Sequence, residues 1–225
     1  MISQYWKGLT SRELADEHDV TQKTVLAWLT EYTSLLYRFL CRQIQRYTPK
    51  LHVDELFLKM KKTFYYLWDS ICSDTRFAFW NLFERRTAKS GKSLLDESPR
   101  TDLVVTDGAF TYPRIIRERY HGTARHLNCV KFEDKPNNNL IERLQNTLRR
   151  FLHPRRGFNS LQTGITQLHG FWIFYNFIRN HTGIGMSPAE KAGLIQPWKT
   201  QKTVKTRLQT LIRKATHFWH ILYLP

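Results

Sequence analysis

Three segments rich in aromatic and β-branched residues follow one another between residues 50 and 83 of this 225-residue chain. Short polar breaks, KK and SD, separate them. Breaks of this length fit hairpin turns, and residues of these types favour strands. The stretch therefore predicts an antiparallel meander with strands at 50–60, 62–72 and 75–83.

Helices and strands alternate after the meander. The sequence predicts helices at 88–98, 112–120 and 140–152, and strands at 101–108 and 124–132. Three antiparallel strands followed by helix, strand, helix, strand and helix is the order of a ribonuclease H-like core, a mixed sheet covered by helices. We therefore expect a mixed α/β fold.

The N-terminal segment has the pattern of two short helices. Thr10 and Glu13 have capping-box spacing, and Thr21 can cap a second helix that turns Val25, Trp28 and Leu29 inward. Two such helices with a tight turn predict a helix-turn-helix, whose second helix enters the major groove of DNA.

Gln22 and Lys23 would be exposed on that second helix and are candidate DNA contacts. An ordinary helical hairpin is the alternative, because residues 1–36 hold five acids and three bases. Apolar spacing then extends the helical pattern over 33–48, and Pro49 would end it.

These patterns divide the chain into three regions. We expect a helix-turn-helix DNA-binding region at 1–48, a ribonuclease H-like catalytic core at 49–160, and C-terminal helices with a basic tail at 161–225. Ser187, Pro188 and Glu190 form a capping box in the last region.

The charge predicts a polyanionic partner, because the formal net charge is +16. No apolar run is long enough to span a bilayer and the N-terminus lacks a signal-peptide core, so DNA is favoured over a membrane. Cys41, Cys72 and Cys129 form no CxxC pair, which fits a reduced protein without a zinc site. We expect a cytoplasmic, nucleoid-associated protein.

Three acids occupy places where they could converge. Asp54 lies within the first predicted strand, Asp107 at the end of the fourth, and Glu142 in the first turn of a basic helix. Fifty-two residues separate the first two acids and thirty-four separate the last two. In the predicted fold the two strands are neighbours and the helix can pack over the same edge.

Three converging carboxylates repel one another, and divalent cations relieve that repulsion. Mg²⁺ prefers oxygen ligands and keeps positions open for phosphate oxygens. A pair of such ions can promote phosphodiester cleavage and transfer by in-line displacement. We therefore predict that Asp54, Asp107 and Glu142 hold Mg²⁺, with Mn²⁺ as a substitute and two ions as the expected number.

Each of these acids also has a simpler interpretation. Asp54 could be a solubility charge, Asp107 part of a turn, and Glu142 a helix-terminus acid favoured by the macrodipole. Spacing alone does not exclude a second set of acids, namely Asp69, Asp74, Asp102, Glu133 and Asp134.

The chain resembles the DDE transposases of prokaryotic insertion sequences, which have a retroviral-integrase-like core. The matching pieces are HVDE, YYLWDSICSDTRF, VVTDGAFTY, NNNLIERLQNTLRR, RRGFNS, YNFIRNH and SPAEKAGL. The resemblance extends to about residue 195, and the small single-core, cointegrate-forming members are the most similar. It implies that Asp54, Asp107 and Glu142 are the catalytic metal-binding triad.

The resemblance also implies an activity. Such enzymes hydrolyse DNA at the transposon end, and the freed 3′-hydroxyl then attacks target DNA. Double-stranded DNA is the implied partner, and joining two ends implies a homo-oligomer. Facing on the predicted helix that carries Glu142 suggests further DNA contacts. They are Asn139, Arg143 and Arg149 along that helix, with Arg155 and Arg156 as candidate contacts to the DNA backbone.

Two other functions remain open. One is a non-catalytic DNA-binding protein, either a decayed transposase copy or a helix-turn-helix regulator. The other is a metal-dependent nuclease of the same fold that performs no strand transfer. The complete triad and the C-terminal motifs favour the transposase.

Overall fold

The computed structural model describes residues 1–225 apart from 61–62, 130–137, 156–157, 159, 199–202 and 223–225. The chain divides into two compact units. The sheet unit comprises Gln45–Arg150 and Arg156–Leu161, and the helical unit comprises Met1–Ile44, Phe151–Arg155 and Gln162–Pro225.

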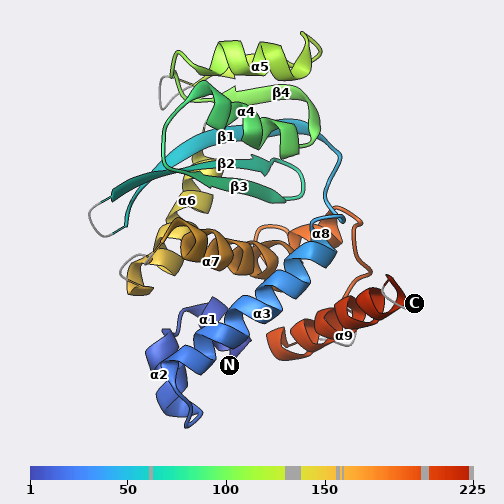
Figure 1. Ribbon diagram of the computed structural model, residues 1–225. Helices are drawn as coiled ribbons and strands as arrows, with labels where there is room; N and C mark the ends of the chain where they lie inside the picture. The colour runs from blue at the N-terminus through green and yellow to red at the C-terminus, as the bar shows by residue number, and fades with distance from the viewer. Residues whose placement is uncertain (61–62, 130–137, 156–157, 159, 199–202, 223–225) are drawn as a thin grey trace. The chain divides into compact units, whose positions relative to one another are not determined.

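The described strands of the sheet unit form one five-stranded sheet in the order β3-β2-β1-β4-β5 (Figure 1). Its strands are β1 (Tyr47–Met60), β2 (Thr63–Cys72), β3 (Ala78–Phe83), β4 (Arg100–Thr106) and β5 (Arg125–Asn128). The first three pair antiparallel, and β4 and β5 run parallel to β1. The predicted meander and the mixed sheet are therefore confirmed.

The helices of this unit cover both faces of the sheet. They are α4 (Ala88–Glu97), α5 (Tyr112–Tyr120) and α6 (Asn139–Leu152), whose residues up to Arg150 belong to the sheet unit. Trp68 on β2 contacts α5 through an edge-to-face pair with Tyr112, whereas its neighbour Asp69 accepts a hydrogen bond from Gln145 of α6. Because successive strand residues point to opposite faces, α5 and α6 lie on opposite sides of the sheet.

The predicted end of the N-terminal helical segment is wrong. A single helix, α3 (Gln22–Leu40), ends eight residues before position 48, and Tyr47 already pairs with Arg100 of β4. The buried Thr48 hydroxyl donates to Asp74 Oδ1 at 2.7 Å, which helps fix this start of β1. Helical periodicity shows an apolar face, but it does not show where the chain meets a strand partner.

The helical unit contains α1 (Ile2–Lys7), α2 (Ser11–Glu17), α3, α7 (Leu161–Ile173), a π-helical turn (Phe174–Ile178), α8 (Pro188–Lys191) and α9 (Val204–Leu222). The capping boxes predicted at Thr10 and Ser187 are both present. Thr21 also caps α3 as predicted, because its hydroxyl accepts from the Thr24 N–H at 3.1 Å. Val25 and Leu29 of α3 are buried.

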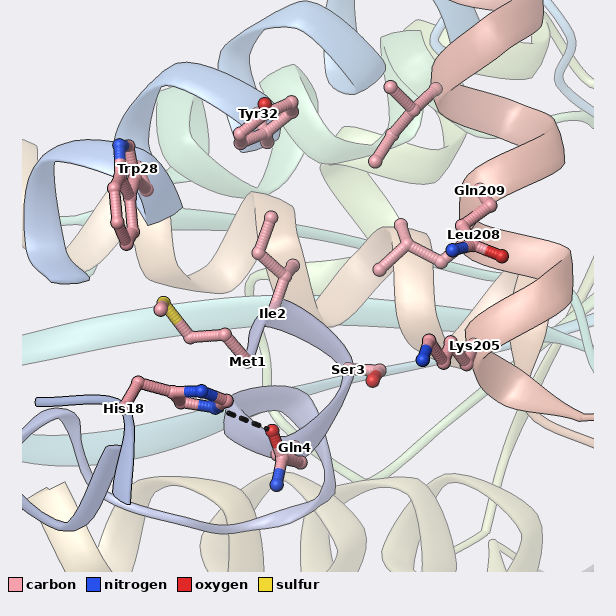
Figure 2. A pocket seen from close by; sticks show the side chains of 11 residues that line it. Met1, Ile2, Ser3, Gln4, His18, Trp28, Tyr32, Lys205, Leu208 and Gln209 are labelled. Carbon is pink, nitrogen blue, oxygen red and sulfur yellow. Dashed lines mark hydrogen bonds between the residues drawn. The ribbon is translucent and has the colours of Figure 1, made fainter. Parts of the chain in front are cut away.

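Trp28 differs from its predicted inward position, since 37% of it is exposed. Val25 and Leu29 lie on the buried face of α3. Trp28 lies at the edge of that face, one turn before Tyr32. Both aromatic residues border a pocket of about 820 Å³ in the helical unit (Figure 2). Its lining comprises Met1, Ile2, Ser3, Gln4, His18, Trp28, Tyr32, Lys205, Leu208, Gln209 and Ile212.

Within the described part of the chain, none of the helices combines the length and the apolar character that crossing a membrane requires.

Candidate active site

Two of the predicted metal ligands lie level on adjacent parallel strands. His52 of β1 pairs with Val105 of β4, so Asp54 and Asp107 are each two residues further along. Asp54 is within β1, and Asp107 directly follows the last residue of β4. The parallel register therefore brings these two carboxylates to the same level of the sheet.

The Asp54 carboxylate is held from two sides. Its Oδ1 accepts from the Glu55 N–H at 2.8 Å, and its Oδ2 accepts from Gln145 Nε2 at 3.1 Å. Burial, followed by the charges of Asp107 and Glu55, raises the pKa of Asp54 to about 7. Asp54 and Asp107 therefore repel each other when both are ionised.

The loop that carries Asp107 is fixed to β1. Asp107 Oδ1 accepts from the Ala109 N–H at 3.1 Å, which closes a tight turn. The Tyr112 hydroxyl then donates to Glu55, and Arg86 forms an ion pair with the same carboxylate. Burial and the charge of Glu55 raise the pKa of Tyr112 well above its ordinary value, so the phenol stays protonated as a donor.

Glu142 lies in the first turn of α6 and is exposed. It is one helical turn before Gln145, the residue that reaches Asp54. Among the described residues, no three His, Cys, Asp or Glu side chains lie close enough together to hold a metal ion. The structure thus places Asp54 and Asp107 at the same level of the sheet, and it places Glu142 on α6, one turn before the glutamine that contacts Asp54.

Two buried residues at this site were not among the predicted ligands. Asp69, which the sequence left as an alternative acid, is opposite Asp54 in the β1–β2 register and is completely buried. Gln145, also buried, donates to Asp69 Oδ1 at 3.3 Å as well as to Asp54. The strand register places Asp69 beside Asp54, and only a β1–β2 alignment made in advance could have shown this from sequence.

The other alternative acids are elsewhere or outside the described structure. Asp102 is exposed and accepts from the Tyr47 hydroxyl at 2.6 Å, and Asp74 accepts from Thr48. Glu133 and Asp134 lie outside the described residues.

The donor groups fit a divalent cation. Asp54 and Asp107 present carboxylate oxygens, the ligands that Mg²⁺ prefers. Burial, followed by the charges of Asp107 and Glu55, raises the pKa of Asp54, so this site disfavours the ionised carboxylate unless a cation is bound. A bound cation would compensate the charges of the ionised carboxylates.

The predicted DNA contacts are mostly on the surface. Gln22, Lys23, Arg143 and Arg149 are exposed, and Asn139 is half-buried at the start of α6. The Gln22 amide donates to Ser11 Oγ at 2.9 Å, and Arg149 Nη1 donates to Asn146 Oδ1 at 3.2 Å. The Arg155 side chain and the whole of Arg156 lie outside the described part of the chain.

The raised pKa of Asp54 predicts a pH-dependent stability. A carboxyl group with a folded-state pKa near 7 keeps its proton on folding at pH 5 or 6, whereas the unfolded chain releases it. The free energy of unfolding should therefore fall as the pH rises from about 4 to 7. Without divalent metal, Asp54→Asn should be more stable than the wild type by roughly 2–4 kcal/mol at pH 8, and by little at pH 4. Urea unfolding at both pH values measures this, and equal differences at both would contradict it.

A family model matches more than half of the chain. The DDE domain model of IS240 transposases matches residues 48–181, which include Asp54, Asp107 and Glu142. Among curated proteins, none matches the chain significantly.

Solved structures are similar to the chain at low sequence identity. A chain of the simian T-cell lymphotropic virus intasome, in complex with the PP2A regulatory subunit B56 gamma, is 15% identical with a TM-score of 0.52. This match covers 66% of the present chain and 55% of the other, and it shows an integrase-like fold.

Two integrase catalytic core domains also match. The HTLV-2 domain, in complex with magnesium, is 14% identical with a TM-score of 0.49, and the match covers 65% of this chain and 97% of that one. The BIV domain gives the same identity and TM-score, with 64% and 92% covered.

Proposed function

Because the chain belongs to the DDE domain family of IS240 transposases, we propose that it cleaves DNA at the ends of an insertion sequence and joins those ends to target DNA. The observation that carries this proposal is the placement of Asp54 and Asp107 at the same level of adjacent parallel strands, where burial, followed by the charges of Asp107 and Glu55, raises the pKa of Asp54. Such an arrangement suits a cation-dependent phosphoryl transfer.

Asp54, Asp107 and Glu142 are the residues proposed to hold Mg²⁺, for which Mn²⁺ can substitute, with two ions in the complete site. When bound, the ions supply activation of the attacking oxygen and stabilisation of the leaving oxygen. The HTLV-2 integrase core was solved with magnesium, which agrees with this choice of metal. The protein's own part is to orient the carboxylates through Gln145, the Ala109 N–H and the Tyr112–Glu55 bond.

DNA is proposed to contact both units. In the helical unit, α2 and α3 would act as a helix-turn-helix, with Gln22 and Lys23 at the exposed start of α3. In the sheet unit, Asn139, Arg143 and Arg149 would line the path beside Glu142 on α6. Arg155 and Arg156 would add contacts to the phosphate backbone.

Lys23 provides a test of the helix-turn-helix. Lys23→Ala should weaken duplex binding and should lower the slope of log K against log salt by about one, because one phosphate contact is lost. Fluorescence anisotropy at several salt concentrations measures both quantities. Lys92→Ala is the matched control, since this lysine is paired with Asp96 on α4. Equal slopes for the wild type and Lys23→Ala would contradict the assignment.

The reaction outcome is proposed to be a cointegrate, and the active form a homo-oligomer that holds two transposon ends. The test uses a donor plasmid that carries the DNA flanking the coding sequence on both sides, together with a target plasmid and Mg²⁺. Fused donor–target molecules with joined 3′ ends are the predicted product, detected by sequencing across the junctions. Cleavage without joining would instead indicate a nuclease. Binding without cleavage would indicate a non-catalytic DNA-binding protein.

A further inference from the structure

A buried polar cluster connects Asp54 to α6. Asp54 and Asp69 are opposite each other in the β1–β2 register and point to the same face of the sheet. Gln145 Nε2 lies 3.1 Å from Asp54 Oδ2 and 3.3 Å from Asp69 Oδ1, so one amide group donates to both carboxylates. Asp69 is 0% exposed and Gln145 is 5% exposed.

Asp69 is unfavourable for folding by itself. Its Oδ2 is buried and has no hydrogen-bond partner among the described residues. A buried and only partly satisfied carboxyl destabilises a core that an apolar residue would fill better. This arrangement suggests a contribution of Asp69 other than stability.

Complete burial also limits what Asp69 can contact. Because the Asp69 side chain has no exposed surface, it cannot contact a DNA phosphate. It can act on Asp54 through Gln145, whose amide donates a hydrogen bond to Asp54. Gln145 is also one turn after Glu142, on the adjoining surface of α6. The Gln145 bridge therefore connects the strand that carries Asp54 to the helix turn that carries Glu142.

We propose that Asp69 and Gln145 form a positioning pair, which orients Asp54 and fixes the first turn of α6 for binding of a divalent cation. This inference rests on the proposed function, because it concerns the same site. Asp69 accepts one of the two amide hydrogens of Gln145 and so orients the amide. The amide in turn directs Asp54 Oδ2. Residues that orient metal ligands typically change metal affinity by about 10- to 100-fold when they are replaced.

The experiment measures Mn²⁺ affinity of the full chain without DNA, from the free Mn²⁺ signal in electron paramagnetic resonance. Gln145→Leu and Asp69→Leu should each raise the Mn²⁺ Kd by about 10- to 100-fold. The double variant should be no weaker than the weaker single variant, because both changes break one bridge. Asp69→Asn should remain near the wild-type Kd, since its amide oxygen can still accept from Gln145.

Gln167→Leu is the matched control, because this glutamine is equally buried but lies in α7 of the helical unit. It should leave the Kd unchanged, and circular dichroism verifies the fold of every variant. Wild-type affinity in folded Gln145→Leu would overturn the proposal. Equal losses in Asp69→Asn and Asp69→Leu would also overturn it, because the carboxylate would then act by its charge.

Failure of the proposed function gives a different result. If the wild type binds no Mn²⁺, the metal site and the positioning pair are both refuted. If the wild type binds Mn²⁺, Glu142→Gln weakens binding and Gln145→Leu does not, only the positioning pair is refuted.

Discussion

Replacing Asp107 by asparagine is expected to lower the rate of metal-dependent DNA cleavage at least about a thousandfold. The carboxylate lies level with Asp54 at the end of β4, and its loss removes one anionic ligand from the site. Stabilisation by a bound metal amounts to several kcal/mol, and about 1.4 kcal/mol corresponds to a factor of ten in rate. Single-turnover cleavage of a labelled duplex in Mn²⁺ measures the effect.

Asp102→Asn is the matched control for this variant. Asp102 lies on the same strand, but it is exposed and contacts the Tyr47 hydroxyl. The control should cleave at the wild-type rate, and asparagine at position 107 can still accept from the Ala109 N–H and preserve the turn. Cleavage within tenfold of the wild type by Asp107→Asn would remove Asp107 from the proposed site.

Replacing Gly91 by valine is expected to destabilise the sheet unit severely. A Cβ atom at this position of α4 would lie 2.8 Å from Ile115 Cδ1 and 2.8 Å from Trp68 Cζ3, and both of these side chains are fully buried. The helix would have to move away from β2 and α5. Overpacking of this kind costs about 1–3 kcal/mol or more, which exceeds the helix propensity gained by removing a glycine.

Urea unfolding followed by Trp fluorescence measures this loss. Gly183→Val is the control, because nothing lies within 4 Å of the Cβ position at Gly183. The control should unfold within about 0.5 kcal/mol of the wild type, as expected for a surface substitution. A Gly91→Val variant as stable as the control would show that α4 does not pack against β2 as described.

The sheet could be predicted from sequence because its signals are local. Aromatic and branched runs with two-residue breaks define the meander, and capping boxes at Thr10 and Ser187 define two helix starts. The position of Asp107 at the end of β4 is predictable for the same reason, since the apolar run of β4 ends just before it. These features depend on neighbours in the chain.

The surroundings of Asp54 could not be predicted in this way. Asp69 becomes its neighbour only through the β1–β2 register, and Gln145 only through the rotation of α6. The Tyr112–Glu55 contact joins residues that are 57 positions apart. Such contacts depend on how helices and strands pack against one another, so composition and periodicity do not predict them. The early end of α3 at Leu40 has the same origin, because pairing with β4 determines where β1 begins.

Nicking of supercoiled plasmid by the wild type and by Glu142→Gln, in Mg²⁺ or Mn²⁺ and with EDTA as the blank, shows whether the three acids act as one catalytic metal site. It requires no knowledge of the transposon ends, and it tests the one predicted ligand that lies exposed on α6. Metal-dependent nicking by the wild type that is absent in Glu142→Gln is the predicted result. Equal nicking by both proteins would contradict the assignment of Asp54, Asp107 and Glu142 as one catalytic metal site.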